Sequence, residues 1–88
     1  MAGVDLMKAM VATIRAEAAA QELSMRALAI KSGLKPDRIK NYTSRGYDMP
    51  LPIAKQLADG LGMTLADLVR LAEERQERGI EDDTEDEG

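Results

Sequence analysis

The twenty residues 25–44, MRALAIKSGLKPDRIKNYTS, constrain the fold of this chain more than any other segment. Gly33 follows Ala29 by four residues, and Pro36 follows Gly33 by three. A small residue such as Ala29 fits where two helices cross at a steep angle, and a glycine accepts the positive φ that a tight turn needs. Proline is tolerated at the first position of a helix, because its missing N–H would be unpaired there. The segment therefore predicts two short helices joined by a tight turn, a helix-turn-helix.

The second of these helices, expected over residues 36–43, should have one buried side and one exposed side. Ile39 and Tyr42 are three residues apart, so both should pack against the rest of the domain, with only the tyrosine hydroxyl at the surface. The polar side chains left facing outward are Asp37, Arg38, Lys40 and Asn41. Together they can donate hydrogen bonds to DNA base edges and accept hydrogen bonds from them. The alternative interpretation is an ordinary solvated helix face.

The net charge of −4 conceals an uneven distribution along the chain. Residues 80–88 carry six of the sixteen acidic residues and no basic one, so the remaining chain has twelve basic against ten acidic residues, a net charge of +2. Between Arg26 and Arg45 there are six basic residues and a single acidic one, Asp37. Positive charge is thus concentrated on the predicted helix-turn-helix, as binding to duplex DNA requires.

The composition argues against an enzyme. The chain has no histidine and no cysteine, which removes the usual general base, the commonest metal ligand, disulfides and thiolate metal sites. A nucleophile would need a serine–lysine pair, but Ser24, Ser32 and Ser44 occupy structural positions of the helix-turn-helix. We therefore expect no catalytic residues, no metal and no cofactor. The absence of cysteine and of a long apolar run fits a cytoplasmic protein that does not enter the membrane.

The pattern of apolar residues predicts an all-α domain over residues 1–79, followed by a disordered acidic tail at 80–88. In the first helix, the expected apolar stripe is Val4, Met7, Val11, Ile14 and Ala18. Ser24 and Thr64 should cap the second and fifth helices. The five expected helices cover about residues 4–20, 25–32, 36–43, 50–60 and 65–79.

Three segments together carry a family resemblance: LSMRALAIKSGL, KPDRIKNY and LPIAKQLADGLGMTLADLV. Between Leu23 and Leu71 the chain resembles the lambda-repressor-like (XRE/Cro-type) DNA-binding domain, including the N-terminal heads of LexA-like repressors of bacteria and phages. The loop SRGYDMPLP departs by one residue from the usual spacing, and Lys35 replaces the common Ser or Thr cap. No protease domain follows, so the chain is expected to be a stand-alone regulator or the head of a longer one.

The resemblance implies a sequence-specific transcriptional regulator, most simply a repressor, with residues 36–43 in the major groove of double-stranded DNA. The implied base-contacting residues are Pro36, Asp37, Arg38 and Asn41. Arg38 would pair with a guanine and Asn41 with an adenine. The implied phosphate-contacting residues are Ser24, Met25, Arg26, Lys35, Lys40, Thr43, Ser44, Arg45 and Tyr47. For Tyr47, packing of the loop is an equal alternative.

In the lambda-repressor-like family, the last helix is the usual dimerisation element. We expect Val69, Leu71 and Ala72 at a homodimer interface, with Ile80 as a further candidate and Ala72 also assigned to the core. A two-fold dimer would favour a palindromic operator, because its two recognition helices would lie about one DNA turn apart. The alternative is a helix that serves only its own domain.

Two further questions stay open from the sequence. The same fold could be a protein-binding module, an antitoxin or anti-repressor, acting through its long last helix and acidic tail. The tail could be a solubilising end, a competitor of DNA for the basic segment, or a contact site for a protein partner such as RNA polymerase.

Overall fold

The computed structural model describes residues 5–45 and 48–78, and all of its regular structure is helical. The helices are α1 (Leu6–Ala20), α2 (Met25–Lys31), α3 (Pro36–Thr43), α4 (Leu51–Gly60) and α5 (Leu65–Arg78). The predicted all-α fold with five helices and a central helix-turn-helix is confirmed, and each predicted boundary within these ranges is right to within one or two residues. The predictions for Val4, Tyr47, Ile80 and the acidic tail lie outside the described residues.

Side-chain caps begin three of the helices. The Asp5 carboxylate accepts from the Met7 N–H at 3.2 Å, the Ser24 hydroxyl from the Ala27 N–H at 3.0 Å, and the Thr64 hydroxyl from the Asp67 N–H at 3.0 Å. Each bond satisfies one of the N–H groups that a helix start leaves without a backbone partner. The predicted caps of α2 and α5 are confirmed.

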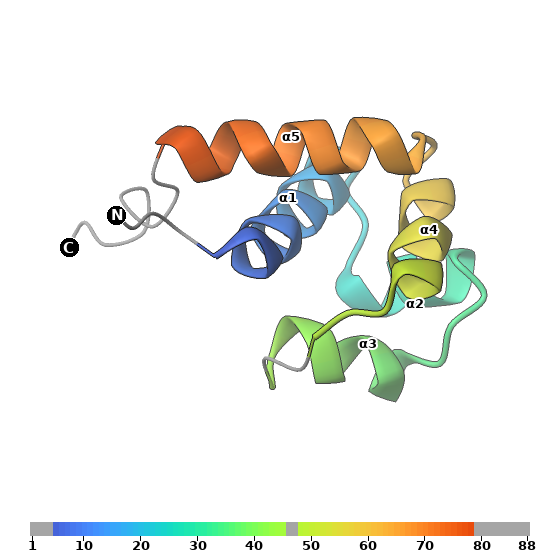
Figure 1. Cartoon of the computed structure of the whole chain (residues 1–88). Coiled ribbons are helices and arrows are strands. Elements are labelled where there is room, and N and C mark those ends of the chain that lie inside the picture. The colour runs from blue at the N-terminus through green and yellow to red at the C-terminus, as the bar shows by residue number, and fades with distance from the viewer. Residues whose placement is uncertain (1–4, 46–47, 79–88) are drawn as a thin grey trace, which may run out of the picture.

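Helices α1 and α5 lie on one side of the molecule and α3 lies on the other (Figure 1). Helix α5 packs against α1, while α3 packs mainly against α2. Helix α4 packs against both α2 and α5. Of the eight residues of α3, only Ile39 and Tyr42 are buried.

Every helix contributes one fully buried, branched apolar side chain to a common core. These are Ile14, Leu28, Ile39, Leu57 and Leu68, in chain order from α1 to α5. Burying a side chain of this size stabilises a fold by roughly 1.5–3 kcal/mol relative to leaving it exposed. In a domain this small, the packing of each helix on the core therefore depends on a few buried side chains.

The buried face of α1 differs from the predicted stripe. Ala9, Met10 and Thr13 are buried together with Ile14 and Ala18, whereas Met7 and Val11 are only partly covered. The predicted stripe did not include Ala9, Met10 or Thr13, and Thr13 is the one polar residue among them. The Thr13 hydroxyl donates to the Ala9 carbonyl oxygen at 2.8 Å, which satisfies it inside the core.

The turn between α2 and α3 has the predicted geometry. Gly33 has a φ of +79°, and Ala29 is completely buried. The Leu34 N–H donates to the Ala29 carbonyl at 2.8 Å, and the Gly33 N–H donates to the Ile30 carbonyl at 3.1 Å. This is the double hydrogen bond of a helix end with a left-handed residue, and it directs the buried Leu34 back onto the core.

The end of α1 has the same geometry without a glycine, which the sequence did not indicate. Glu22 has a φ of +60°, while the Leu23 N–H donates to the Ala18 carbonyl at 2.8 Å. A non-glycine residue in this region is strained, so the surrounding hydrogen bonds must hold it there.

Close packing between α2 and α4 depends on the absence of a side chain at Gly60. A Cβ atom at this position would collide with the Ser32 hydroxyl oxygen and would lie 3.3 Å from Cδ1 of Leu28. The Gln56 side chain also donates to the Ser32 carbonyl at 3.3 Å. These contacts fix the first helix of the helix-turn-helix on α4.

We expect the substitution Ala29→Glu to unfold the domain, because it forces an unpaired charge into the crossing of α2 and α3. The matched control is Ile30→Glu at the next position, where the side chain is 61% exposed. Thermal melting followed by circular dichroism should show no cooperative transition for the first variant and a near-normal transition for the second. A folded Ala29→Glu variant would contradict the structure of the turn.

Candidate nucleic-acid interface

Helix α3 presents a polar face to solvent because two apolar side chains hold its other face on the core. Ile39 is 1% exposed and Tyr42 is 8% exposed, as the sequence predicts. Asp37, Arg38 and Lys40 are exposed and Asn41 is half-buried. The four predicted base-contacting residues, Pro36, Asp37, Arg38 and Asn41, therefore share one short helix.

Seven of the nine predicted phosphate-contacting residues line one of two hollows on the flanks of α3, whereas Ser24 lines neither and Tyr47 lies outside the described residues. On one flank a hollow of about 330 Å³ lies between the start of α2 and α3, and its lining includes Arg26, Lys40 and Ser44. Met25 also lines this hollow, but its side chain packs against the core and is partly buried. Ser24, Lys35 and Ser44 are exposed, and Thr43 is half-buried. The hollow thus brings the start of α2 next to residues of α3.

The other flank of α3 is a shallow hollow where two side-chain pairs form. The Arg38 Nε group donates to the Tyr42 hydroxyl at 3.5 Å. The Arg45 Nη1 group donates to the Asn41 side-chain oxygen at 2.8 Å. Both pairs line this hollow together with Lys35 and Asp37. Two predicted base-contacting residues are thus held by neighbours on their own helix or just beyond it.

The basic residues of this region carry no ion pair among the described residues. All six, from Arg26 to Arg45, are exposed, and the ion pairs lie instead on α4 and α5. Lys55 pairs with Asp59 at 2.6 Å, and Arg70 pairs with Asp67 and Glu74. The charge of α2 and α3 is therefore available to an external polyanion.

Arg15 on α1 is a residue of this region that the sequence did not indicate. Its Nη2 group donates to the Thr43 carbonyl at 2.8 Å, and the residue lines the hollow beside Arg26 and Lys40. Thr43 is the last residue of α3, so a cation there satisfies an orphan carbonyl and interacts favourably with the helix dipole. The two residues are 28 positions apart, and no local pattern could have indicated the pair.

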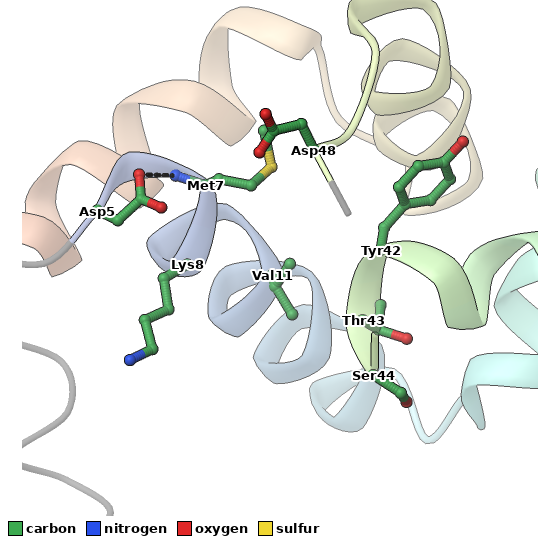
Figure 2. Close-up of a pocket in the computed structure, with 8 residues that line it drawn as sticks. All are labelled: Asp5, Met7, Lys8, Val11, Tyr42, Thr43, Ser44 and Asp48. Carbon is green, nitrogen blue, oxygen red and sulfur yellow. Dashed lines mark hydrogen bonds between the residues drawn. The ribbon is translucent and has the colours of Figure 1, made fainter. Parts of the chain in front are cut away.

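A separate hollow of about 490 Å³ opens between the first half of α1 and the end of α3 (Figure 2). Its charged side chains are Asp5, Lys8 and Asp48. The Asp5 carboxylate is the cap of α1, and the Lys8 amine points away from it. With two carboxylates against one cation, this hollow lacks the positive charge of the flanks of α3.

The predicted dimerisation residues divide into two groups. Val69 and Leu71 are partly exposed, whereas Ala72 is completely buried in the core. The assignment of Ala72 to the core is confirmed and its assignment to a dimer interface is wrong, because its own domain covers the side chain completely. The sequence also missed Leu51, which is 66% exposed and shares a largely apolar hollow with Leu6 and Val69.

No protein-family model matches the chain, and no curated protein matches it. Two crystal structures of the clp gene regulator ClgR from Corynebacterium glutamicum are similar to it. One has a TM-score of 0.79 at 18% identity and covers 93% of this chain and 87% of that chain. The other has a TM-score of 0.73 at 20% identity and covers 85% and 96%. At this identity the likeness establishes the fold, an all-α domain with a helix-turn-helix. Across the part that the structure describes, none of the helices is long and apolar enough to span a membrane.

We expect Arg15→Met to loosen the end of α3 while leaving the domain folded. Loss of one hydrogen bond to a charged group at the surface should cost about 1 kcal/mol or less. Hydrogen exchange should be faster at the amides of Ser44 and Arg45, which donate to the last turn of α3. Lys8→Met, an exposed change on the same helix, is the control and should leave these amides unchanged.

Proposed function

We propose that this chain is a sequence-specific DNA-binding regulator of transcription of the XRE/Cro type, most simply a repressor. The observation that carries the proposal is the set of six basic residues on and next to the helix-turn-helix, all exposed and without an ion pair among the described residues. Binding such a set to DNA phosphates releases condensed counterions, which supplies much of the affinity of DNA-binding proteins.

The geometry suits insertion of α3 into the major groove. An α-helix with its side chains is about 10–12 Å wide, close to the width of that groove. Asp37, Arg38 and Asn41 would face the bases from the exposed side of the helix. The two flanking hollows would place Arg26 and Lys40 on one side and Lys35 and Arg45 on the other, near the phosphates of the groove edges.

The comparison with ClgR supports the same role. Its name describes a gene regulator, and the shared fold includes both helices of the helix-turn-helix. The sequence resemblance to lambda-repressor-like domains agrees with this assignment. In this proposal, Arg38 binds a guanine and Asn41 binds an adenine.

We further propose that the regulator binds a palindromic operator as a homodimer. The proposed contact surface consists of the apolar side chains Leu6, Leu51 and Val69, whereas Leu71, the other predicted contact on α5, does not line this hollow. Asp48 and Met49, between α3 and α4 in the chain, also line this hollow. A two-fold axis there would bring two recognition helices to one side of the dimer.

The alternative on the same fold is a protein-binding module, an antitoxin or anti-repressor. The exposed apolar side chains Ile30 and Leu51 favour it, because they could contact another protein. The positive charge around α3 favours DNA. A role of the acidic tail in contacting a protein stays a prediction.

Selection from a random duplex library, followed by titration over a range of salt concentrations, tests the proposed function. We expect an enriched palindrome and a steep fall of affinity with salt. Weak binding without an enriched sequence would contradict a sequence-specific regulator and favour the protein-binding module.

Arg38→Ala should weaken binding to the selected site and relax the preference at one base pair. The loss should be about 1–3 kcal/mol, the contribution of a good bidentate contact. The melting temperature should stay nearly unchanged, since Arg38 is exposed. Lys31→Ala, also exposed on the helix-turn-helix, is the control for a simple loss of charge and should keep the base preference.

Leu51→Glu should convert the proposed dimer to a monomer without unfolding the domain. Leu51 is the first residue of α4, where a carboxylate is favourable for the helix dipole. Sedimentation equilibrium should show half the mass of the wild type, and Ala66→Glu at an exposed position of α5 should leave the mass unchanged. Equal masses for Leu51→Glu and the wild type would exclude this contact surface.

A further inference from the structure

The chain turns back over the last turn of α3 and brings Arg45 to Asn41. The N–H groups of Ser44 and Arg45 both donate to the Lys40 carbonyl oxygen, at 2.9 and 3.1 Å. This shared acceptor tightens the end of the helix, so the guanidinium of Arg45 reaches the side chain four residues earlier. The resulting hydrogen bond to Asn41 Oδ1 is 2.8 Å long.

The chemistry of the two groups sets the direction of the Asn41 carboxamide. A guanidinium has only donors, so the atom of the amide that faces it must be the oxygen. A free asparagine can exchange the places of its oxygen and nitrogen by rotating its terminal group. With Arg45 in contact, one of the two arrangements is selected.

That selection matters for base recognition. To bind an adenine with two hydrogen bonds, an asparagine accepts from N6 and donates to N7, and the reversed amide presents the wrong polarity at both atoms. The carbonyl oxygen has two lone pairs, so it can hold Arg45 and still accept one bond from a base. The contact therefore orients Asn41 without consuming its capacity to bind a base.

We propose that Arg45 is a positioning residue that sets the orientation of the Asn41 carboxamide and thereby the base that Asn41 selects. The inference rests on the proposed DNA-binding function and deepens it. It also changes the role of Arg45, which the sequence assigned only to phosphate. Asn41 is half-buried in the hollow that both side chains line, so its position is already restricted.

The environment of a DNA groove strengthens this pair. In solution Arg45 is exposed, and water competes for its donors. When the helix enters the groove, water is displaced and a hydrogen bond to a charged donor becomes stronger. The second pair of the helix, between Arg38 and Tyr42, has the same spacing of four residues. Two side chains that are predicted to contact bases thus have hydrogen-bond partners in the protein before DNA binds.

The test compares Arg45→Met with Arg26→Met, which removes a cation from the other flank of α3. One probe is the DNA duplex that the full chain selects. The other three are variants of this duplex in which one base pair is replaced, at the position where Asn41→Ala abolishes the base preference. For Arg45→Met, we expect discrimination among these four duplexes to fall by roughly fivefold or more, as for loss of a bidentate contact. For Arg26→Met, affinity should fall equally for all four, with a salt slope smaller by about one.

A double-mutant cycle separates orientation from a second, independent contact. In the Asn41→Ala background, Arg45→Met should cause no further loss of discrimination at that base pair, because both substitutions disrupt the same interaction between Arg45 and Asn41. An equal loss of affinity for all four duplexes in Arg45→Met would overturn the proposal and make Arg45 a phosphate contact. Failure of the wild type to select any duplex would overturn the proposed function as well, so the two failures are distinguishable.

NMR of the free protein tests the hydrogen bond between Arg45 and Asn41 without DNA. The side-chain amide of Asn41 should show changed nitrogen and proton shifts in Arg45→Met and unchanged shifts in Arg26→Met, while circular dichroism shows both variants folded. An Asn41 amide that is insensitive to Arg45→Met would overturn the proposal.

Discussion

The hydrogen bond from the Leu34 N–H to the Ala29 carbonyl closes the turn on which the rest of the structure depends. It ends α2, commits Gly33 to positive φ and directs Leu34 into the core. Helix α3, with eight residues, is too short to be stable in water by itself. It exists because the turn delivers it to the core at an angle that buries Ile39 and Tyr42. The position of every polar side chain on α3 follows from this one crossing.

The ion pairs that stabilise the fold and the cations that can bind a partner lie on different helices. Within residues 5–45 and 48–78 the ion pairs lie on α4 and α5, and buried apolar side chains link all five helices. The cations of α2 and α3 are left without carboxylate partners in the described ranges, so their mutual repulsion opposes folding slightly. Such an arrangement is costly for a domain with a small core, and it is favourable once phosphates neutralise the charge.

The end of α3 is where the fold and the candidate recognition chemistry meet. Arg15 reaches from α1 to the Thr43 carbonyl, and Arg45 bonds to Asn41 just upstream. The first contact fixes the helix on the domain, and the second orients a side chain on its exposed face. A helix that is held at its last turn can keep its polar side chains in a narrow range of positions, which reduces the entropy lost on binding.

The sequence by itself determined the helix boundaries, the caps at Ser24 and Thr64, the turn at Gly33 and the buried side of α3, because each depends on interactions within a few residues. It also located the positive charge, since all six cations lie in one segment of twenty residues. Only the tertiary structure decided that Thr13 is buried and that Leu51 is exposed, because burial depends on which helices pack together. The tether from Arg15 to Thr43 spans 28 residues, and a contact at that separation leaves no local pattern to find.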